Sequence, residues 1–154
     1  MKIFLFSLVA FIALVSFSFI AGRKPEITTE KVIAGNQGIQ FIVSDWNKAL
    51  REAKTKRKLI FLDAYASWCG PCKSLKKNTF PDPVVGDFFN KNFINVAVDM
   101  EKGDGPALSQ LYQVDAYPTL IITDASGKLV AYTKGYMSPK QLLDFGKYGL
   151  SQGE

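Results

Sequence analysis

The chain has 154 residues, a formal net charge of +5, two cysteines and no histidine. A zinc site needs about four nitrogen or sulfur ligands, so this composition excludes one within a single chain and leaves only a metal shared between two chains. The charge is mild, and its one basic cluster, within residues 51–58, is interpreted as a solvated helix end. We predict no nucleic-acid partner, because such surfaces combine stronger basic charge with interleaved aromatic side chains.

The start of the chain predicts an export signal. Lys2 precedes residues 3–22, which carry no charge and are almost wholly apolar, as in secretory signals. We expect cleavage after Ser18, with weaker sites after Ala21 or Gly22. The apolar core at residues 3–20 is also close to the about 20 residues that cross a membrane. An uncleaved N-terminal anchor is therefore the alternative, and both interpretations predict an exported, periplasmic or otherwise extracytoplasmic protein.

Three segments are expected: a signal or anchor at 1–22, a polar linker at 23–38 with one short strand at 31–34, and one domain at 39–150. The about 130 residues after the signal suffice for a single core. Hydrophobic periodicity predicts, in order, a strand at 38–43, a helix at 45–55 capped by Ser44, a strand at 59–65, helices at 72–78 and 83–90, a strand at 93–99, a helix at 106–112, strands at 120–123 and 129–133, and a helix at 139–148 capped by Ser138. This order predicts an α/β fold with a mixed sheet.

The two cysteines lie at a predicted strand-to-helix junction. Cys69 and Cys72 are separated by Gly70 and Pro71, directly after an apolar strand. Proline suits the first turn of a helix, and the unpaired N–H groups there favour a thiolate, as dithiol–disulfide exchange requires. A structural disulfide is one alternative, although so short a loop adds little stability. Two inert buried thiols are another, but they leave the neighbouring Trp68, glycine and proline unexplained.

The sequence Trp-Cys-Gly-Pro-Cys-Lys at residues 68–73, preceded by Asp63, resembles the thioredoxin family. Tyr117-Pro118-Thr119 is similar to the cis-proline loop of that family. The resemblance spans residues 39–150 and implies a thioredoxin fold, with a central mixed β-sheet flanked by helices on both faces. Residues 78–85 look more like one subgroup, the C-terminal extracytoplasmic domain of transmembrane thiol:disulfide interchange reductases.

The resemblance implies roles for three catalytic residues. Cys69 is the exposed nucleophile, and the more buried Cys72 resolves the mixed disulfide. Asp63 exchanges a proton with Cys72, and its burial in an apolar strand should raise its pKa; a solvent-facing aspartate at the strand end is the alternative. Thioredoxins often place a lysine near this acid, whereas this chain has Asn95 at that position, so the control of the aspartate pKa departs from the family pattern.

The resemblance also implies a substrate groove. Its expected residues are Trp68, Gly70, Pro71, Tyr117, Pro118 and Gly135. The bond before Pro118 is expected to be cis, and its loop should pair with the substrate backbone and deny a metal access to the thiols. Trp68 as an ordinary core aromatic is the alternative.

Together these features predict an exported oxidoreductase that reduces protein disulfides. No histidine lies between the cysteines, where strongly oxidising relatives place one to stabilise the dithiol, so a reductant is favoured. We expect no metal, no cofactor besides the redox-active Cys69–Cys72 disulfide, a membrane-bound electron donor and a monomeric protein. A disulfide oxidase or isomerase, or a non-catalytic binding module with the same fold, are the alternatives.

Overall fold

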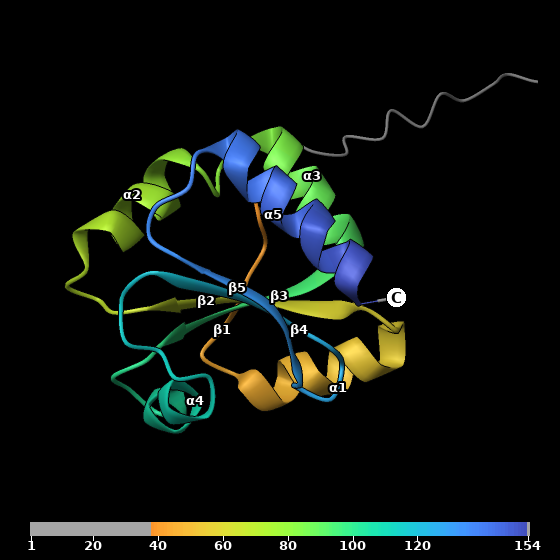
Figure 1. Ribbon diagram of the computed structural model, residues 1–154, viewed down its shortest axis with the longest axis horizontal. Helices are drawn as coiled ribbons and strands as arrows, with labels where there is room; N and C mark the ends of the chain where they lie inside the picture. The colour runs from red at the N-terminus through yellow and green to blue at the C-terminus, as the bar shows by residue number, and fades with distance from the viewer. Residues whose placement is uncertain (1–37, 154) are drawn as a thin grey trace, which may run out of the picture. The chain divides into compact units, whose positions relative to one another are not determined.

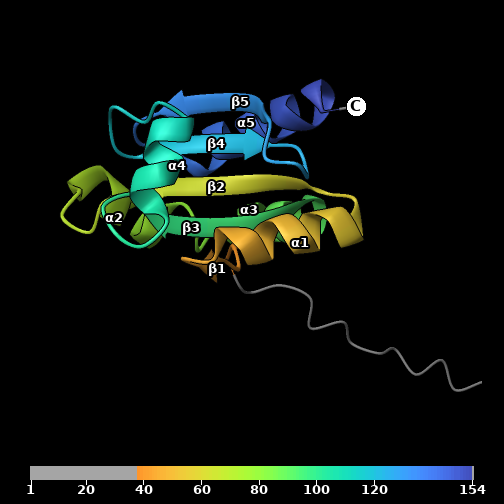
Figure 2. The same ribbon diagram turned by 90° about the horizontal axis from the view of Figure 1, so that it is seen from below.

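The computed structural model of the protein describes residues 38–153 (Figures 1 and 2). The predicted signal or anchor, its cleavage sites, the linker and the short strand at 31–34 lie outside the described residues. Among the helices of the described part, none combines the length and the hydropathy needed to cross a membrane.

The described residues form one mixed sheet. Its strands are β1 (Ile42–Val43), β2 (Leu59–Tyr65), β3 (Phe93–Asp99), β4 (Thr119–Thr123) and β5 (Leu129–Lys134). Their order across the sheet is β1-β3-β2-β4-β5, which Figure 2 shows from bottom to top. β3 is parallel to β1 and β2, whereas β4 is antiparallel to β2 and β5. The predicted mixed sheet is therefore confirmed.

Helices cover both faces of this sheet. They are α1 (Trp46–Lys56), α2 (Gly70–Asn78), α3 (Pro83–Asn92), α4 (Gly105–Leu111) and α5 (Pro139–Gln152). In Figure 1, α2, α3 and α5 lie above the sheet, and α1 and α4 lie below it. Each face has its own hydrophobic cluster. One joins α1 and α4 to the sheet, and the other joins α2, α3 and α5 to it.

The alternation of side chains along β2 decides which residue faces which cluster. Ile60 and Leu62 pack in the cluster under α1 and α4. Phe61 packs in the cluster under α2, α3 and α5, where its ring centroid lies 4.6 Å from that of Phe89. Because successive side chains of a strand point to opposite faces, Asp63 lies on the same face as Phe61, the face that carries α2.

The first strand is shorter than the sequence predicts. The strand expected over 38–43 is reduced to Ile42–Val43. The reason lies in where the preceding amides donate: the N–H of Ile39 to the carbonyl of Phe80, and that of Gln40 to the side chain of Asn90. These two amides therefore donate to the segments around α3 and not to the backbone of β3, whereas the side chain of Asn95 on β3 donates to the carbonyl of Gln40.

The predicted cap of α1 is also wrong. Asp45, not Ser44, is the N-cap, and its carboxylate accepts the N–H of Lys48 at 2.8 Å. Ser44 instead has a left-handed backbone (φ 52°) and donates its own N–H to the carbonyl of Ala97. Ser138 does cap α5, within a capping box completed by Gln141. The strands predicted at 59–65 and 93–99 have the predicted bounds, and the other elements predicted within the described residues are present with shifts at their ends.

Candidate functional site

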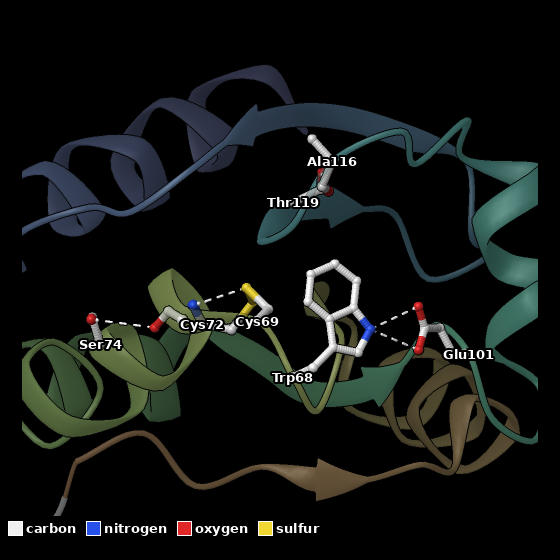
Figure 3. The surroundings of a disulfide bond; sticks show 8 residues. Trp68, Cys69, Cys72, Ser74, Glu101, Ala116 and Thr119 are labelled. Carbon is white, nitrogen blue, oxygen red and sulfur yellow. Dashed lines mark hydrogen bonds between the residues drawn. A yellow bond between two sulfur atoms is a disulfide. The ribbon is translucent and has the colours of Figure 1, made fainter.

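Cys69 and Cys72 form a disulfide at the start of α2 (Figure 3). Cys69 is the N-cap of this helix, and its Sγ accepts the backbone N–H of Cys72 at 3.1 Å. Pro71 lies in the first turn, where its missing N–H costs nothing. The predicted strand-to-helix junction is therefore present, although α2 begins at Gly70 rather than at Cys72. The first turn of the helix thus directs one backbone N–H, that of Cys72, at the sulfur of Cys69.

The two cysteines do not differ in exposure, contrary to the prediction of an exposed Cys69 and a more buried Cys72. Each is only 2% exposed. Both pack against Ala66, and the rings of Tyr65 and Tyr117 lie alongside them. In the disulfide form the Cys69 sulfur is bonded to that of Cys72 and is covered by this cluster.

Trp68 lies beside the disulfide and is 65% exposed, so the alternative of an ordinary core aromatic is wrong. Its indole N–H donates to both carboxylate oxygens of Glu101 at 3.0 Å (Figure 3). Its ring meets Tyr117 edge to face, with 5.8 Å between the centroids. These contacts fix the orientation of the exposed Trp68 ring next to Cys69.

Sequence reasoning did not identify Glu101. The signal for it depends on the strand pairing: Trp68 follows β2 and Glu101 follows β3, and the structure shows these two strands as parallel neighbours in register, with Tyr65 opposite Asp99. Residues just beyond the ends of two such strands meet at the same edge of a sheet.

The proline loop has the geometry that the resemblance implied. The Tyr117–Pro118 peptide bond is cis. The carbonyl of Pro118 accepts the N–H of Gly135 at 2.8 Å, and the hydroxyl of Thr119 donates to the carbonyl of Ala116 at 2.8 Å. Gly135 adopts a positive φ of 92°, a conformation that glycine accepts without strain. Gly135 therefore stabilises the proline loop through this hydrogen bond.

Gly70 and Pro71 lie on the solvent side of the disulfide. Both are exposed. A Cβ added at Gly70 would meet no heavy atom within 4 Å. This surface is therefore open next to the two sulfurs.

Asp63 is buried, so a solvent-facing aspartate is excluded. It is 1% exposed, and neither of its carboxylate oxygens has a hydrogen-bond partner among the described residues. Burial raises the pKa of this carboxyl to about 7, and the positive charge of Lys76 opposes that rise. Asp63 can thus gain or lose a proton near neutral pH.

The cation that acts on Asp63 is carried by α2 and not by β3. Asn95, at the position where thioredoxins often have lysine, donates its amide to the side chain of Asn90 at 3.1 Å. Lys76 lines a cavity together with Asp63. Sequence reasoning missed Lys76, although its spacing of four residues from Cys72 places both on one side of the helix.

Among the residues that the structure describes, no three or more histidine, cysteine, aspartate or glutamate side chains form a group that could hold a metal ion.

Comparison with known proteins places the site in context. The family described as "Thioredoxin-like domain" matches residues 46–150. The chain is 32% identical over 102 residues to the thiol:disulfide interchange protein DsbD of Pectobacterium atrosepticum, a match covering 64% of the chain and 17% of that relative. It is 30% identical over 102 residues to thioredoxin H-type of Brassica oleracea, covering 66% of the chain and 78% of that protein. The chain thus spans less than a fifth of the DsbD relative.

Solved structures give the same fold. The chain is similar to a candidate disulphide-isomerase from Bacteroides thetaiotaomicron, with a TM-score of 0.67 and 41% identity, over 77% of this chain and 98% of that one. It is also similar to a thioredoxin from Thermus thermophilus, with a TM-score of 0.66 and 17% identity, over 75% of this chain and 91% of that one. The second likeness concerns the fold alone. Together they confirm the predicted thioredoxin fold.

Proposed function

Because this chain belongs to the thioredoxin-like family of thiol–disulfide oxidoreductases and carries a close cysteine pair, we propose that it is an exported enzyme that reduces protein disulfides. The observation that carries this proposal is the position of Cys69 and Cys72. They occupy the N-cap and the first turn of α2, beside the cis-proline loop of Pro118.

The reaction begins with the reduced pair. The Cys69 thiolate, favoured by the N-terminus of α2, attacks one sulfur of a substrate disulfide and forms a mixed disulfide, and the other substrate sulfur leaves as a thiolate. Cys72 then gives its proton to Asp63, and its sulfur attacks that of Cys69. The bond between Cys69 and the substrate breaks, and the second substrate thiolate leaves. Two electrons have passed from the enzyme dithiol to the substrate, and the Cys69–Cys72 disulfide remains.

Asp63 is the base for Cys72 in this scheme. A general base works best when its pKa is close to the working pH, and the pKa of Asp63 is about 7. Its carboxylate has no hydrogen-bond partner among the described residues, so both oxygens remain available to take a proton.

The substrate lies in the groove around the sulfurs. Its proposed residues are Trp68, Gly70, Pro71, Tyr117, Pro118 and Gly135. An extended segment of a protein substrate passes beside the proline loop, in the manner of a strand added to a sheet edge. The rings of Trp68 and Tyr117, which meet edge to face, form one wall of this groove, and the surface at Gly70 is open.

Export and electron supply complete the proposal. The uncharged residues 3–22 support export, with or without cleavage. Outside the cytoplasm the Cys69–Cys72 disulfide must be reduced again after every turnover, so we propose a membrane-bound electron donor. We also propose that the protein acts as a monomer.

The direction of the reaction is tested by the reduction potential. Every thiolate-stabilising group favours the dithiol and makes a protein more oxidising. Gly70 and Pro71 offer no side-chain donor to the thiolate, and the chain has no histidine. We expect a potential nearer the about −270 mV of thioredoxin than the about −120 mV of strong oxidants, measured by equilibration with glutathione. A value more positive than about −180 mV would overturn the reductase proposal.

A second candidate function is disulfide isomerisation. It is favoured by the 41% identity to the candidate disulphide-isomerase, of which the chain covers 98%. An isomerase would restore activity to a scrambled disulfide protein without added oxidant. A reductase would leave that protein reduced.

A further inference from the structure

A cavity of ≈ 350 Å³ connects the buried Asp63 to the protein surface. It is lined by Gly38, Ile39, Phe41, Val43, Asp63, Tyr65, Lys76, Phe80, Pro81 and Ala97. Asp63 is fully buried, whereas Val43, Lys76 and Pro81 are exposed. The cavity is therefore bordered on its inner side by Asp63, whose carboxylate has no hydrogen-bond partner among the described residues, and on its outer side by solvent-exposed residues.

Lys76 is held at this cavity by an aromatic ring. Its Nζ lies 3.3 Å from the ring centroid of Tyr65, which is a cation–π contact. Tyr65 follows Asp63 by two positions on β2, so the two side chains lie on the same face of the sheet. The ring thus fixes the ammonium on the side of the sheet where Asp63 is buried.

The same lysine is linked to the cysteines through the helix. Lys76 follows Cys72 by four residues in α2, and residues at this spacing lie one above the other on one helix face. The resolving cysteine, the lysine and the buried carboxylate therefore share the space between α2 and β2.

We propose that Lys76 is a positioning residue for proton transfer: its ammonium, held on the Tyr65 ring, stabilises the ionised Asp63, and the cavity carries the proton from Asp63 to solvent. This inference rests on the proposed function, in which Asp63 takes the proton of Cys72. The proton leaves the Cys72 sulfur, resides on Asp63, and passes to water in the cavity. No other reactant is required.

The neighbours of Asp63 leave Lys76 as the cation that acts on it. Burial raises the pKa of Asp63, and Lys76 lowers it. On β3 the residue opposite Asp63 is Ala97, and on β4 it is Leu120. The nearest acid on β3, Asp99, lies opposite Tyr65. It is paired with Lys102 at 3.2 Å. The titratable groups that α2 and β2 place on this side of the sheet are Lys76 and Cys72, which each contact Tyr65, and Tyr65 itself.

The test measures the titration of Asp63 in the oxidised protein, in which the cysteines carry no protons. NMR of the ¹³C-labelled aspartate carboxyl is followed against pH. Lys76→Met should move the Asp63 midpoint to higher pH by about half a unit or more, since an opposite charge nearby lowers a carboxyl pKa. Lys76→Arg keeps the charge and should restore the midpoint. Lys77→Met, at an exposed neighbouring position of the same helix, is the matched control and should change nothing.

The kinetic readout is the release of substrate from a mixed disulfide with Cys69, recorded as a rate against pH. The rise of this rate with pH should move upward in Lys76→Met by the same amount as the Asp63 midpoint. Tyr65→Leu, which removes the ring, should produce part of this shift, whereas Tyr65→Phe should not. A structural role of Lys76 would alter stability without moving either midpoint.

The failures of the two proposals are distinguishable. An unchanged Asp63 midpoint in Lys76→Met overturns the role of Lys76 and leaves Asp63 as the base. An Asp63→Asn variant that releases substrate at the wild-type rate at every pH overturns the role of Asp63 in the proposed function, and the inference about Lys76 with it.

Discussion

The two faces of the sheet differ in how completely their buried polar side chains are hydrogen-bonded. Under α1 and α4 the cluster is apolar, and the buried hydroxyls of Thr119 and Thr123 both donate to backbone carbonyls. Under α2, α3 and α5 an aromatic cluster surrounds buried polar groups that are incompletely satisfied. The side-chain oxygens that lack a partner in the described part of the chain belong to Asp63 and Asn95, and both residues lie on this second face.

This difference in hydrogen bonding distinguishes a face that stabilises the fold from a face that carries the reactive groups. An unsatisfied buried oxygen costs about 1–3 kcal/mol, and titratable groups with strongly perturbed pKa values cluster at functional sites. Asp63 is on the face covered by the helix that carries Cys69 and Cys72. The face of α1 and α4 carries no comparable group among the described residues, so it serves as an internal reference for every change made on the other.

The largest effect is expected at the cysteines themselves. Cys69→Ser should abolish disulfide reduction, because no nucleophile remains. Cys72→Ser should instead accumulate mixed disulfides through Cys69, since the resolving sulfur is missing. Non-reducing electrophoresis with mass spectrometry of the adducts measures this. Trapping by Cys69→Ser rather than Cys72→Ser would show that the two roles are reversed.

The next effect is the cost of burying a carboxylate. Asp63 has a pKa of about 7 in the folded protein, against an ordinary value of 3.8. The folded state therefore holds the proton more tightly, and stability falls as pH rises from about 4 to about 7. Asp63→Asn should be more stable than wild type by roughly 4 kcal/mol above pH 7, with little difference below pH 4. Denaturant unfolding across this pH range measures it, and equal stabilities at pH 8 would contradict it.

The opposite face supplies the matched control. Leu62 immediately precedes Asp63 on β2, is fully buried and packs under α1 and α4. Leu62→Ala should lose about 2–5 kcal/mol of unfolding free energy through the cavity it leaves. That loss should be the same at pH 4 and pH 8, because no titrating group is involved. A loss of unfolding free energy that varied with pH would contradict the prediction that only the Asp63 face carries a titrating group.

The smallest effect is expected at the rim of the groove, where Glu101 contacts Trp68. Glu101→Ala removes the acceptor of the Trp68 indole N–H. The exposed Trp68 ring should then lose its fixed orientation, and the protein should bind substrate less well. A hydrogen bond worth about 1 kcal/mol corresponds to a rise in KM of about fivefold, with kcat and the pH profile unchanged. Glu101→Gln keeps one acceptor and should lose less. A change in the pH profile would instead connect the rim to the Asp63 side of the site.

Much of this protein was determined by local sequence. The period of apolar residues identified β2, β3 and the helices, because strand and helix repeats are properties of consecutive residues. Pro71 placed the cysteines at a helix start for the same reason. Asp63, the one acid within an apolar run, was predicted to be buried from the sequence, with a solvent-facing aspartate as the alternative that the structure excluded.

The tertiary structure decided what meets across the chain. Glu101 reaches Trp68 because β2 and β3 are parallel neighbours, and Lys76 reaches Tyr65 because α2 packs on the face that Asp63 shares. The covering of Cys69 by Tyr117 depends on the position of the proline loop. Such contacts depend on which strands pair and in which register, and a repeat read along one segment carries no information about the partner of that segment.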